Sequence, residues 1–141
     1  MKEPWDIVYY KAPDGSVPFD AFLTDCPDQV EATILATLEA VAEAPPPQFS
    51  GGGKWEAMHG SMGGNYEVRV SGPKREQFRA FCVLENGTTA ELARRGLRRP
   101  TISVITGLRK PWMQKFTDSD YEKVRSLGTA HRACFPRNIA T

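Results

Sequence analysis

Apolar positions in the first third of the chain follow the spacing of one strand and two helices. The aromatic and β-branched run at residues 5–10 predicts a strand, and the proline and glycine that follow at 12–15 predict a turn. A short helix is expected at Pro18–Leu23, with its phenylalanines on one side. A longer helix is predicted for residues 27–44, because apolar side chains recur there every three or four positions: Val30, Ile34, Leu38 and Val41. Three consecutive prolines at 45–47 end it.

In the second half of the chain the apolar period changes to two. Residues 66–70 alternate, with a glutamate and an arginine on the face opposite to the apolar side chains. Residues 77–84 and 101–108 are apolar on both faces apart from Arg79, which is typical of buried strands. Since short connections join these three strands, we expect them to pair in antiparallel fashion.

A second amphipathic segment near the C-terminus completes the pattern. The sequence at residues 117–120 is typical of a capped helix start, and apolar residues follow it at helical spacing. The expected order is strand, helix, helix, three antiparallel strands and helix, which is an α+β class within one domain spanning 1–141. In that domain, residues 88–100 form an Arg-rich insertion between two strands and residues 135–141 form a tail.

Composition fits a soluble globular domain. The 141 residues are 40% hydrophobic and 25% charged, which is too apolar for a disordered chain, and no long uncharged run predicts a membrane span. The N-terminal stretch lacks the apolar core of a signal peptide, so we expect a cytoplasmic protein. The three cysteines, Cys26, Cys82 and Cys134, are far apart, so we expect isolated, mostly buried thiols and no bound metal.

Charge is divided unevenly along the sequence. Residues 1–47 carry two basic and nine acidic side chains, a balance of −7. Residues 48–141 carry sixteen basic and eight acidic side chains, a balance of +8. Within one domain, such a split indicates a cationic face turned towards a polyanion and an anionic face turned elsewhere.

Three segments resemble strands of the RelE/ParE superfamily, and within it the HigB-like, phage-derived branch of toxins. They are similar to that branch's Tyr-Glu-Leu-Arg strand, its Tyr-Arg-x-Phe strand and its final strand with a basic pair at the end. In this chain they are Tyr66–Val70 (YEVRV), Phe78–Phe81 (FRAF) and Ile102–Lys110 (ISVITGLRK). The resemblance extends over about residues 5–130, although the insertion at 88–100 is longer than the hairpin usual in the family.

The resemblance implies a toxin of a type II toxin–antitoxin system. In that family two N-terminal helices cover one face of an antiparallel sheet, and a concave basic surface lies where the strands meet the C-terminal segment. The implied activity is that of a ribosome-dependent mRNA endoribonuclease, an mRNA interferase that inhibits translation without a metal or organic cofactor. The implied partners are the ribosome with its mRNA and a cognate antitoxin, expected to be a helix-turn-helix protein similar to HigA, with no membrane involved.

Cleavage of RNA without a metal requires a base for the 2′-hydroxyl proton, cations for the phosphorane and a donor for the leaving 5′-oxygen. Arg69, Arg79 and Arg109 match the family's basic strand positions. Arginine suits the phosphate because it stays charged and offers a planar fork to two oxygens. Candidates for the base are Glu67, His131, a Lys110 with a lowered pKa, and the ribosome itself, which would order the RNA.

Most of these candidates also have a structural interpretation. Arg69 on an alternating strand is typical of a solvated side chain that pairs with a neighbouring acid. Arg79 differs, because an unpaired charge in an otherwise apolar strand is costly, which favours a functional role. The pair Arg109-Lys110 also fits a strand that returns to solvent. His131 falls at helical spacing from apolar residues, which favours a packed side chain.

Further basic residues are candidates for binding the RNA backbone. Each contact between a cation and a phosphate adds salt-sensitive affinity. The alternatives are a solvated loop tip or a surface that docks on an acidic antitoxin. The candidates are Arg94, Arg95, Arg98, Arg99 and Lys115.

Two other functions fit the same fold. One is a poison of DNA gyrase, as in the ParE branch, in which the strand arginines would be structural or would bind protein. The other is a non-catalytic relative that only binds RNA or a protein. Glu67, at a position where several RelE relatives carry lysine, favours this last alternative.

Overall fold

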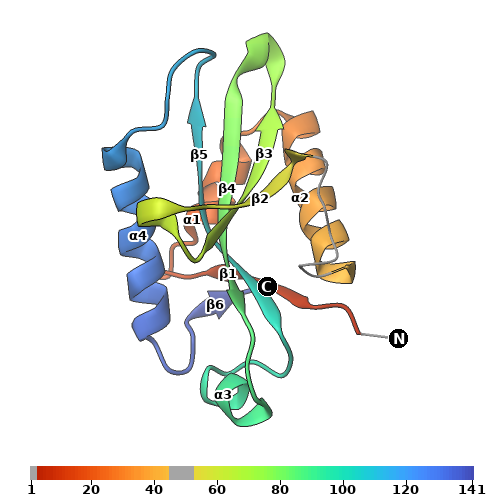
Figure 1. Ribbon diagram of the computed structural model, residues 1–141, viewed down its shortest axis with the longest axis vertical. Coiled ribbons are helices and arrows are strands. Elements are labelled where there is room, and N and C mark those ends of the chain that lie inside the picture. Colours follow the sequence, from red (N-terminus) through yellow and green to blue (C-terminus); the bar gives the residue numbers. More distant parts are fainter. Residues whose placement is uncertain (1–2, 45–52) are drawn as a thin grey trace.

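The computed structural model describes residues 3–44 and 53–141, and their strands form one mixed six-stranded sheet in the order β2-β3-β4-β5-β1-β6 (Figure 1). The strands are β1 (Asp6–Tyr10), β2 (Trp55–Ala57), β3 (Asn65–Ser71), β4 (Gln77–Glu85), β5 (Thr101–Lys110) and β6 (Ile139–Ala140). The helices are α1 (Pro18–Asp25), α2 (Asp28–Glu43), α3 (Thr89–Arg94) and α4 (Asp118–Ala133). Single 3₁₀ turns lie at Gly60–Met62 and Pro73–Arg75.

The predicted α+β order of elements is confirmed. A strand, two helices, three antiparallel strands and a C-terminal helix follow one another, and β4 pairs with β3 on one side and with β5 on the other. The predicted helix stop at residues 45–47 lies outside the described residues. In the part of the chain that the structure describes, no helix combines the length and apolar character needed to cross a bilayer.

The resemblance implied an antiparallel sheet, whereas the sheet is mixed. β1 runs parallel to β5, with Asp6 opposite Thr101. Two short strands were also not predicted: β2 pairs with β3, and β6, in the segment expected to be a free tail, pairs with β1. Strands of two or three residues are too short to show an alternating pattern, and a parallel partner so far along the chain leaves no local signal.

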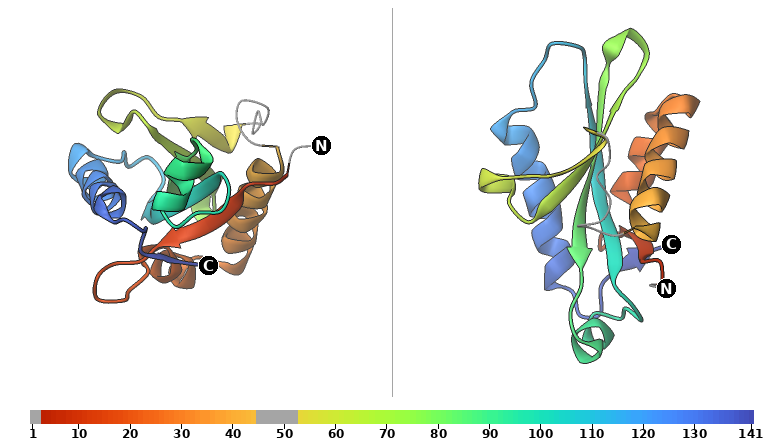
Figure 2. Two further views of the ribbon diagram at one scale, coloured as in Figure 1. Left: turned by 90° about the horizontal axis from the view of Figure 1, so that it is seen from below. Right: turned by 45° about the vertical axis from the view of Figure 1, so that its right-hand side comes forward.

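Helices cover both faces of the sheet (Figure 2). α1 and α2 pack on one face, here called the helical face, and α4 packs on the other, here called the α4 face. The apolar stripe predicted for α2 is buried as expected against side chains such as Val68 and Phe78. The buried members of that stripe are Val30, Ile34, Leu38 and Val41.

The packing of α1 on the sheet depends on a glycine in β5. A Cβ atom added at Gly107 would overlap the ring of Phe22, so only glycine allows this close approach. Phe22 and the neighbouring Phe19 are buried there, in line with the short helix predicted from their spacing. α1 is thereby fixed over the middle of the sheet.

α4 begins at the predicted cap. The Thr117 side chain accepts a hydrogen bond from the Asp120 backbone N–H at 3.2 Å, and the Asp120 carboxylate accepts one from the Thr117 N–H at 2.8 Å. Further along the helix, Val124 is fully buried against Phe81 of β4. The N-terminal half of α4 therefore lies beside the strand ends that carry the predicted cationic residues.

Candidate functional site

Two arginines face each other on the α4 face of the sheet. Arg69 of β3 lies directly opposite Arg79 of β4 in the antiparallel ladder. Phe81 packs against Val124 of α4, so Arg79, two residues earlier in β4, projects to the same face. Like charges in directly opposed positions destabilise a sheet, so fold stability alone does not account for this pair.

Arg79 is half-buried and forms no ion pair within the described residues. Its guanidinium donates to the Phe78 carbonyl at 3.1 Å and to the Gln77 side-chain oxygen at 3.3 Å. It also lies 5.4 Å from the centre of the Phe116 ring. Burial, reinforced by the charge of Arg69, lowers the pKa of Arg79 from its ordinary value, although the guanidinium stays charged near neutral pH. Arg79 therefore presents a partly desolvated cation without a carboxylate partner.

Glu67 is the acid diagonal to this arginine. It lies opposite Phe81 in the ladder, one step along the same face from the arginine pair, and its Oε1 is 3.5 Å from Nε of Arg69. Arg69 also donates to Glu56 of β2 at 3.1 Å. Burial raises the pKa of Glu67 above its ordinary 4.5, while Arg79 and Arg69 oppose that rise. A carboxylate with a raised pKa is a better general base than an exposed one.

Tyr121, in the first turns of α4, is a functional candidate that the sequence analysis missed. Its ring packs edge-on against Phe81, with centroids 6.1 Å apart, and stacks with Phe116 at 6.3 Å. Burial, reinforced by the charge of Glu67, raises the pKa of Tyr121 above its ordinary 10.0, so the phenol keeps its proton at neutral pH. In the sequence, a tyrosine directly after the helix cap could have indicated a functional hydroxyl group. Its spacing also fits an ordinary apolar stripe, so it did not stand out.

Lys110 lies on the same face at the end of β5, opposite Gln77. Its ammonium group contacts the Asp120 carboxylate at 3.1 Å, the same carboxylate that caps α4. Lys110 thus links the last sheet strand to the helix.

Arg109 does not belong with Arg69 and Arg79. It lies opposite Phe78, whose ring is buried in the core under α1 and α2, and so projects from the helical face. Its guanidinium donates twice to Glu76, at 2.6 and 2.7 Å, and once to the Asp25 carbonyl at 2.7 Å. The predicted trio is therefore divided between two faces, and Arg109 joins β5, the β3–β4 turn and the end of α1.

The arginines of the insertion lie at the opposite end of the molecule, around α3 (Figure 1). Arg95 contacts Glu85 at 3.9 Å and Glu91 at 4.0 Å. Arg98 and Arg99 both contact Asp6 of β1, and Arg94 stacks on the ring of Phe135 at 4.2 Å. Of the predicted RNA-binding residues, Lys115 alone lies near Arg79, in the loop between β5 and α4. The insertion is thus exposed at Arg94 and Arg98, and its arginines also contact other parts of the chain.

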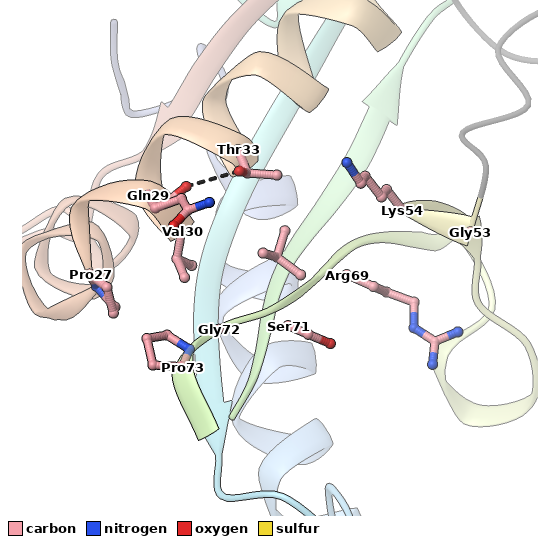
Figure 3. A pocket seen from close by; sticks show the side chains of 11 residues that line it. Pro27, Gln29, Val30, Thr33, Gly53, Lys54, Arg69, Ser71, Gly72 and Pro73 are labelled. Atoms are coloured by element: carbon pink, nitrogen blue, oxygen red, sulfur yellow. Dashed lines mark hydrogen bonds between the residues drawn. The ribbon is translucent and has the colours of Figure 1, made fainter. Parts of the chain in front are cut away.

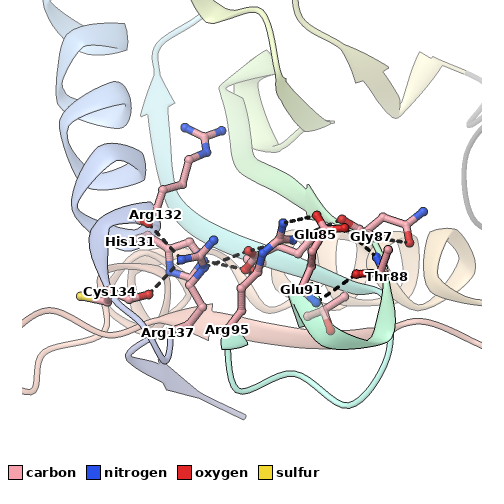
Figure 4. A network of polar contacts seen from close by, with 12 residues as sticks. Glu85, Gly87, Thr88, Glu91, Arg95, His131, Arg132, Cys134 and Arg137 are labelled. Atoms are coloured by element: carbon pink, nitrogen blue, oxygen red, sulfur yellow. Dashed lines mark hydrogen bonds and ion pairs between the residues drawn. The ribbon is translucent and has the colours of Figure 1, made fainter. Parts of the chain in front are cut away.

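His131 is fully buried and belongs to a polar network around Glu85 (Figure 4). Its Nε2 lies 2.9 Å from the Glu85 carboxylate, which also accepts from Ser103 at 2.6 Å and from Arg137 at 2.9 Å. Glu85 is six residues along β4 from Arg79, a separation of about 20 Å. His131 is therefore packed, as its helical spacing indicated, and it is out of reach of the arginine pair.

A separate hollow of about 720 Å³ lies between α2 and β3 on the helical face (Figure 3). Gln29, Val30 and Thr33 of α2 form one wall, and Val70 with the turn after β3 forms the other. Figure 3 shows the Arg69 guanidinium turned away from α2. The described lining offers no acid–base pair, so this groove is not part of the candidate site.

The three cysteines form no disulfide. Cys26 and Cys82 are buried and Cys134 is half-buried, and all three are free. Over residues 3–44 and 53–141, no cluster of three histidine, cysteine or acidic side chains could hold a metal ion.

Comparisons with protein families, with curated proteins and with solved structures gave no significant match. The resemblance to the RelE/ParE superfamily thus rests on the strand motifs and stays a prediction.

Proposed function

We propose that this protein is a RelE-type toxin that cleaves mRNA on the ribosome, with Arg79 at the centre of its site. The observation that carries the proposal is the half-buried Arg79, which opposes another arginine and has no carboxylate within 4.0 Å among the described residues. A protein gains no stability from such an arrangement, whereas a phosphodiester placed between the two guanidinium groups neutralises both. The motifs around Arg69 and Arg79 support the same family.

The side chains near Arg79 supply the other roles in the proposed cleavage. Glu67 takes the proton of the 2′-hydroxyl, whose oxygen forms a bond to phosphorus, and Arg69 and Arg79 bind the non-bridging oxygens of the phosphorane. The bond between phosphorus and the 5′-oxygen then breaks, and Tyr121 donates its proton to that oxygen. The products are a 2′,3′-cyclic phosphate and a 5′-hydroxyl end. Lys110 stabilises the added negative charge while it holds α4 in place.

The proposal implies a cytoplasmic protein whose partners are the ribosome, its mRNA and an antitoxin similar to HigA. An antitoxin neutralises the toxin if an acidic segment covers the arginine pair, because the same charges that bind phosphate bind carboxylates. The uneven distribution of charge supports this arrangement. Acidic side chains of α1 and α2 are exposed on the helical side, away from the α4 face: Asp20, Asp25, Asp28, Glu39 and Glu43.

Expression of the wild-type protein and two variants from a tightly repressed promoter, with growth followed and mRNA 5′ ends mapped, tests the proposal. Wild-type protein is expected to arrest growth and to produce new 5′ ends inside translated frames. Arg79→Ala is expected to lower cleavage at least about a hundredfold, since one phosphorane-binding group is worth about that much. Arg98→Ala is the matched control, because Arg98 is an exposed arginine paired with Asp6 at the far end.

The remaining outcomes separate the alternatives. Growth arrest without mRNA cleavage, together with loss of DNA supercoiling activity in a gyrase assay, would identify a ParE-like poison instead. Harmless expression of folded wild-type protein would leave a non-catalytic relative that binds RNA or protein. Equal cleavage by wild type and Arg79→Ala would remove Arg79 from the site.

A further inference from the structure

A depression of about 620 Å³ lies next to Arg79, between the β3–β4 turn and the β5–α4 loop. Arg75, Arg79 and Lys115 line it, together with Gln77 and Trp112. Within the described residues, none of its three cations has a carboxylate within 4.0 Å. The positive charge of the depression is therefore not neutralised by acidic side chains of the described residues.

Trp112 is an exposed aromatic side chain at the rim of the depression. It is 55% exposed, whereas Trp55 is only 5% exposed, and the adjacent Met113 is 77% exposed. The Arg75 guanidinium lies 4.8 Å from the centre of the Trp112 ring and covers one of its faces. More than half of Trp112 is accessible to solvent despite this contact, so its ring offers a flat apolar surface to a ligand.

Hydrogen bonds from β4 hold the loop that carries Trp112. The Gln77 side-chain amide donates to the Pro111 carbonyl at 3.2 Å and to the Gln114 carbonyl at 2.7 Å, on either side of Trp112 and Met113. The same Gln77 accepts from Arg79 at 3.3 Å. One side chain thus sets the position of the exposed tryptophan relative to the proposed catalytic arginine.

The backbone around the depression is strained on both sides. Lys74 and Arg75 in the β3–β4 turn have left-handed φ values of 55° and 59°, and Met113 in the opposite loop has 70°. Within the described chain these are the non-glycine residues with positive φ. Side chains in this conformation cost stability and persist where the surrounding structure requires them, often at ligand sites.

We propose that this depression binds single-stranded RNA, with one unstacked base on the exposed ring of Trp112 and the neighbouring phosphates on Arg79 and Lys115. The proposal rests on the proposed function, because RNA that reaches Arg79 is the substrate of that function. An exposed aromatic ring among unpaired cations is the usual composition of a surface for single strands. Stacking tolerates every base, so Trp112 contributes affinity and position along the strand rather than base identity.

Titration of the purified protein with a 2′-O-methyl RNA hexamer, which lacks the nucleophile for cleavage, tests this inference. Trp112 fluorescence is expected to be quenched in a saturable manner, and the quenching is expected to disappear in Trp112→Phe, in which Trp5 and Trp55 remain. Trp112→Ala is expected to bind about tenfold more weakly. Because Trp112 is exposed, both variants are expected to melt at the wild-type temperature.

The salt dependence of the same titration isolates the phosphate contacts. Lys115→Ala is expected to reduce the slope of log affinity against log salt by about 0.7, the value of one single-strand phosphate contact. Lys123→Ala, an exposed lysine on the outer surface of α4, is the matched control and should leave the slope unchanged. Equal slopes for the two variants would contradict the phosphate contact at Lys115.

Three results would overturn the inference: no binding of the hexamer, equal affinity of wild type and Trp112→Ala without quenching, or equal affinity for a duplex of the same length. A ribosome cleavage assay separates its failure from that of the proposed function. Protein that binds the hexamer through Trp112 but leaves mRNA intact would refute the nuclease alone. If the Trp112→Ala variant cleaved mRNA and bound the hexamer as well as wild type does, the base platform alone would be refuted.

Discussion

Arg137 at one end of the sheet pairs with a buried carboxylate, whereas Arg79 at the other end has no carboxylate partner among the described residues. At one end, here called the tail end, α3 and the C-terminal segment surround Glu85, and each of four arginines contacts a carboxylate: Arg95, Arg98, Arg99 and Arg137. At the other end, here called the loop end, the β3–β4 turn and the β5–α4 loop flank Arg79. There, among the described residues, Arg75, Arg79 and Lys115 contact aromatic rings or solvent and no carboxylate.

This difference separates stability from function within one small domain. A buried carboxylate with three hydrogen-bonding partners holds separate segments together, and loss of one partner leaves a buried charge uncompensated. A half-buried cation opposite a like charge gains no ion-pair stabilisation in the folded state and keeps its charge available for a ligand. Lys74, Arg75 and Met113 of the loop end also adopt left-handed φ values, which cost stability. We infer that the tail end stabilises the fold and that the loop end binds and cleaves.

The largest effect is expected from acid, which should weaken the tail end. Loss of the Glu85 charge is expected to lower the free energy of unfolding by on the order of 3 kcal/mol. Burial raises the pKa of Glu85, but hydrogen bonds from His131, Ser103 and Arg137 outweigh it and lower the pKa to about 2, against an ordinary 4.5. A lowered pKa means that this stabilisation is complete above pH 4.5 and is lost as the pH falls towards 2.

Urea unfolding between pH 7 and pH 2.5 measures this loss. Glu85→Gln is the matched variant, because it removes the charge and keeps the shape. It is expected to be less stable at pH 7 and to lose less stability on acidification than wild type. Parallel pH dependence of the two proteins would show that Glu85 does not stabilise the tail end.

A second variant tests the loop end through its pH profile. Glu67→Gln is expected to slow cleavage about a hundredfold at pH 7, because the proposed base is lost. Wild-type cleavage should rise with pH through an apparent pKa above 4.5, since burial raises the pKa of Glu67, and the variant should lack this rise. Glu56→Gln, which alters only the exposed acid beside Arg69, is the control and should keep the rise. An unchanged profile in Glu67→Gln would exclude Glu67 as the base.

The smallest effect is expected for Arg109, which lies on the helical face, away from Arg69 and Arg79. Arg109→Ala removes an exposed ion pair with Glu76 and a hydrogen bond to the Asp25 carbonyl, so we expect a loss of about 1 kcal/mol of unfolding free energy. Cleavage per folded molecule should match wild type. Denaturant unfolding and a ribosome cleavage assay give the two values, and a large drop in cleavage without instability would return Arg109 to the site.

Local patterns predicted the longer helices and strands but not the two shortest strands or all of the strand pairings. Residues 27–44 were expected to be helical and α2 spans Asp28–Glu43, because its apolar stripe is a local property of the sequence. The parallel pairing of β1 with β5 and the short strand β6 depend on segments far apart in the chain. Such pairings are determined by the whole core, and a single sequence carries no pattern for them.

The candidate site could be predicted only where a charge interrupted an apolar pattern. Arg79 was identified because it is the one charge within residues 77–84. Arg109 was grouped with Arg69 and Arg79 because a strand that is apolar on both faces does not indicate which way its last residues project, and β4 and β5 also contain an irregularity at Phe81 and Cys82. Trp112 and Tyr121 lie in a loop and at a helix start, where their proximity to Arg79 arises only from the tertiary fold.

The most direct test of the account compares Arg79→Ala with Arg137→Ala in two assays, denaturant unfolding and mRNA cleavage per folded molecule. The account predicts that Arg79→Ala keeps wild-type stability and loses about a hundredfold in cleavage. It predicts that Arg137→Ala loses about 3 kcal/mol of unfolding free energy, because Glu85 is left short of a partner, and cleaves normally while folded. The reverse result, or equal losses of both properties in both variants, would contradict the separation of a stabilising end from a working end.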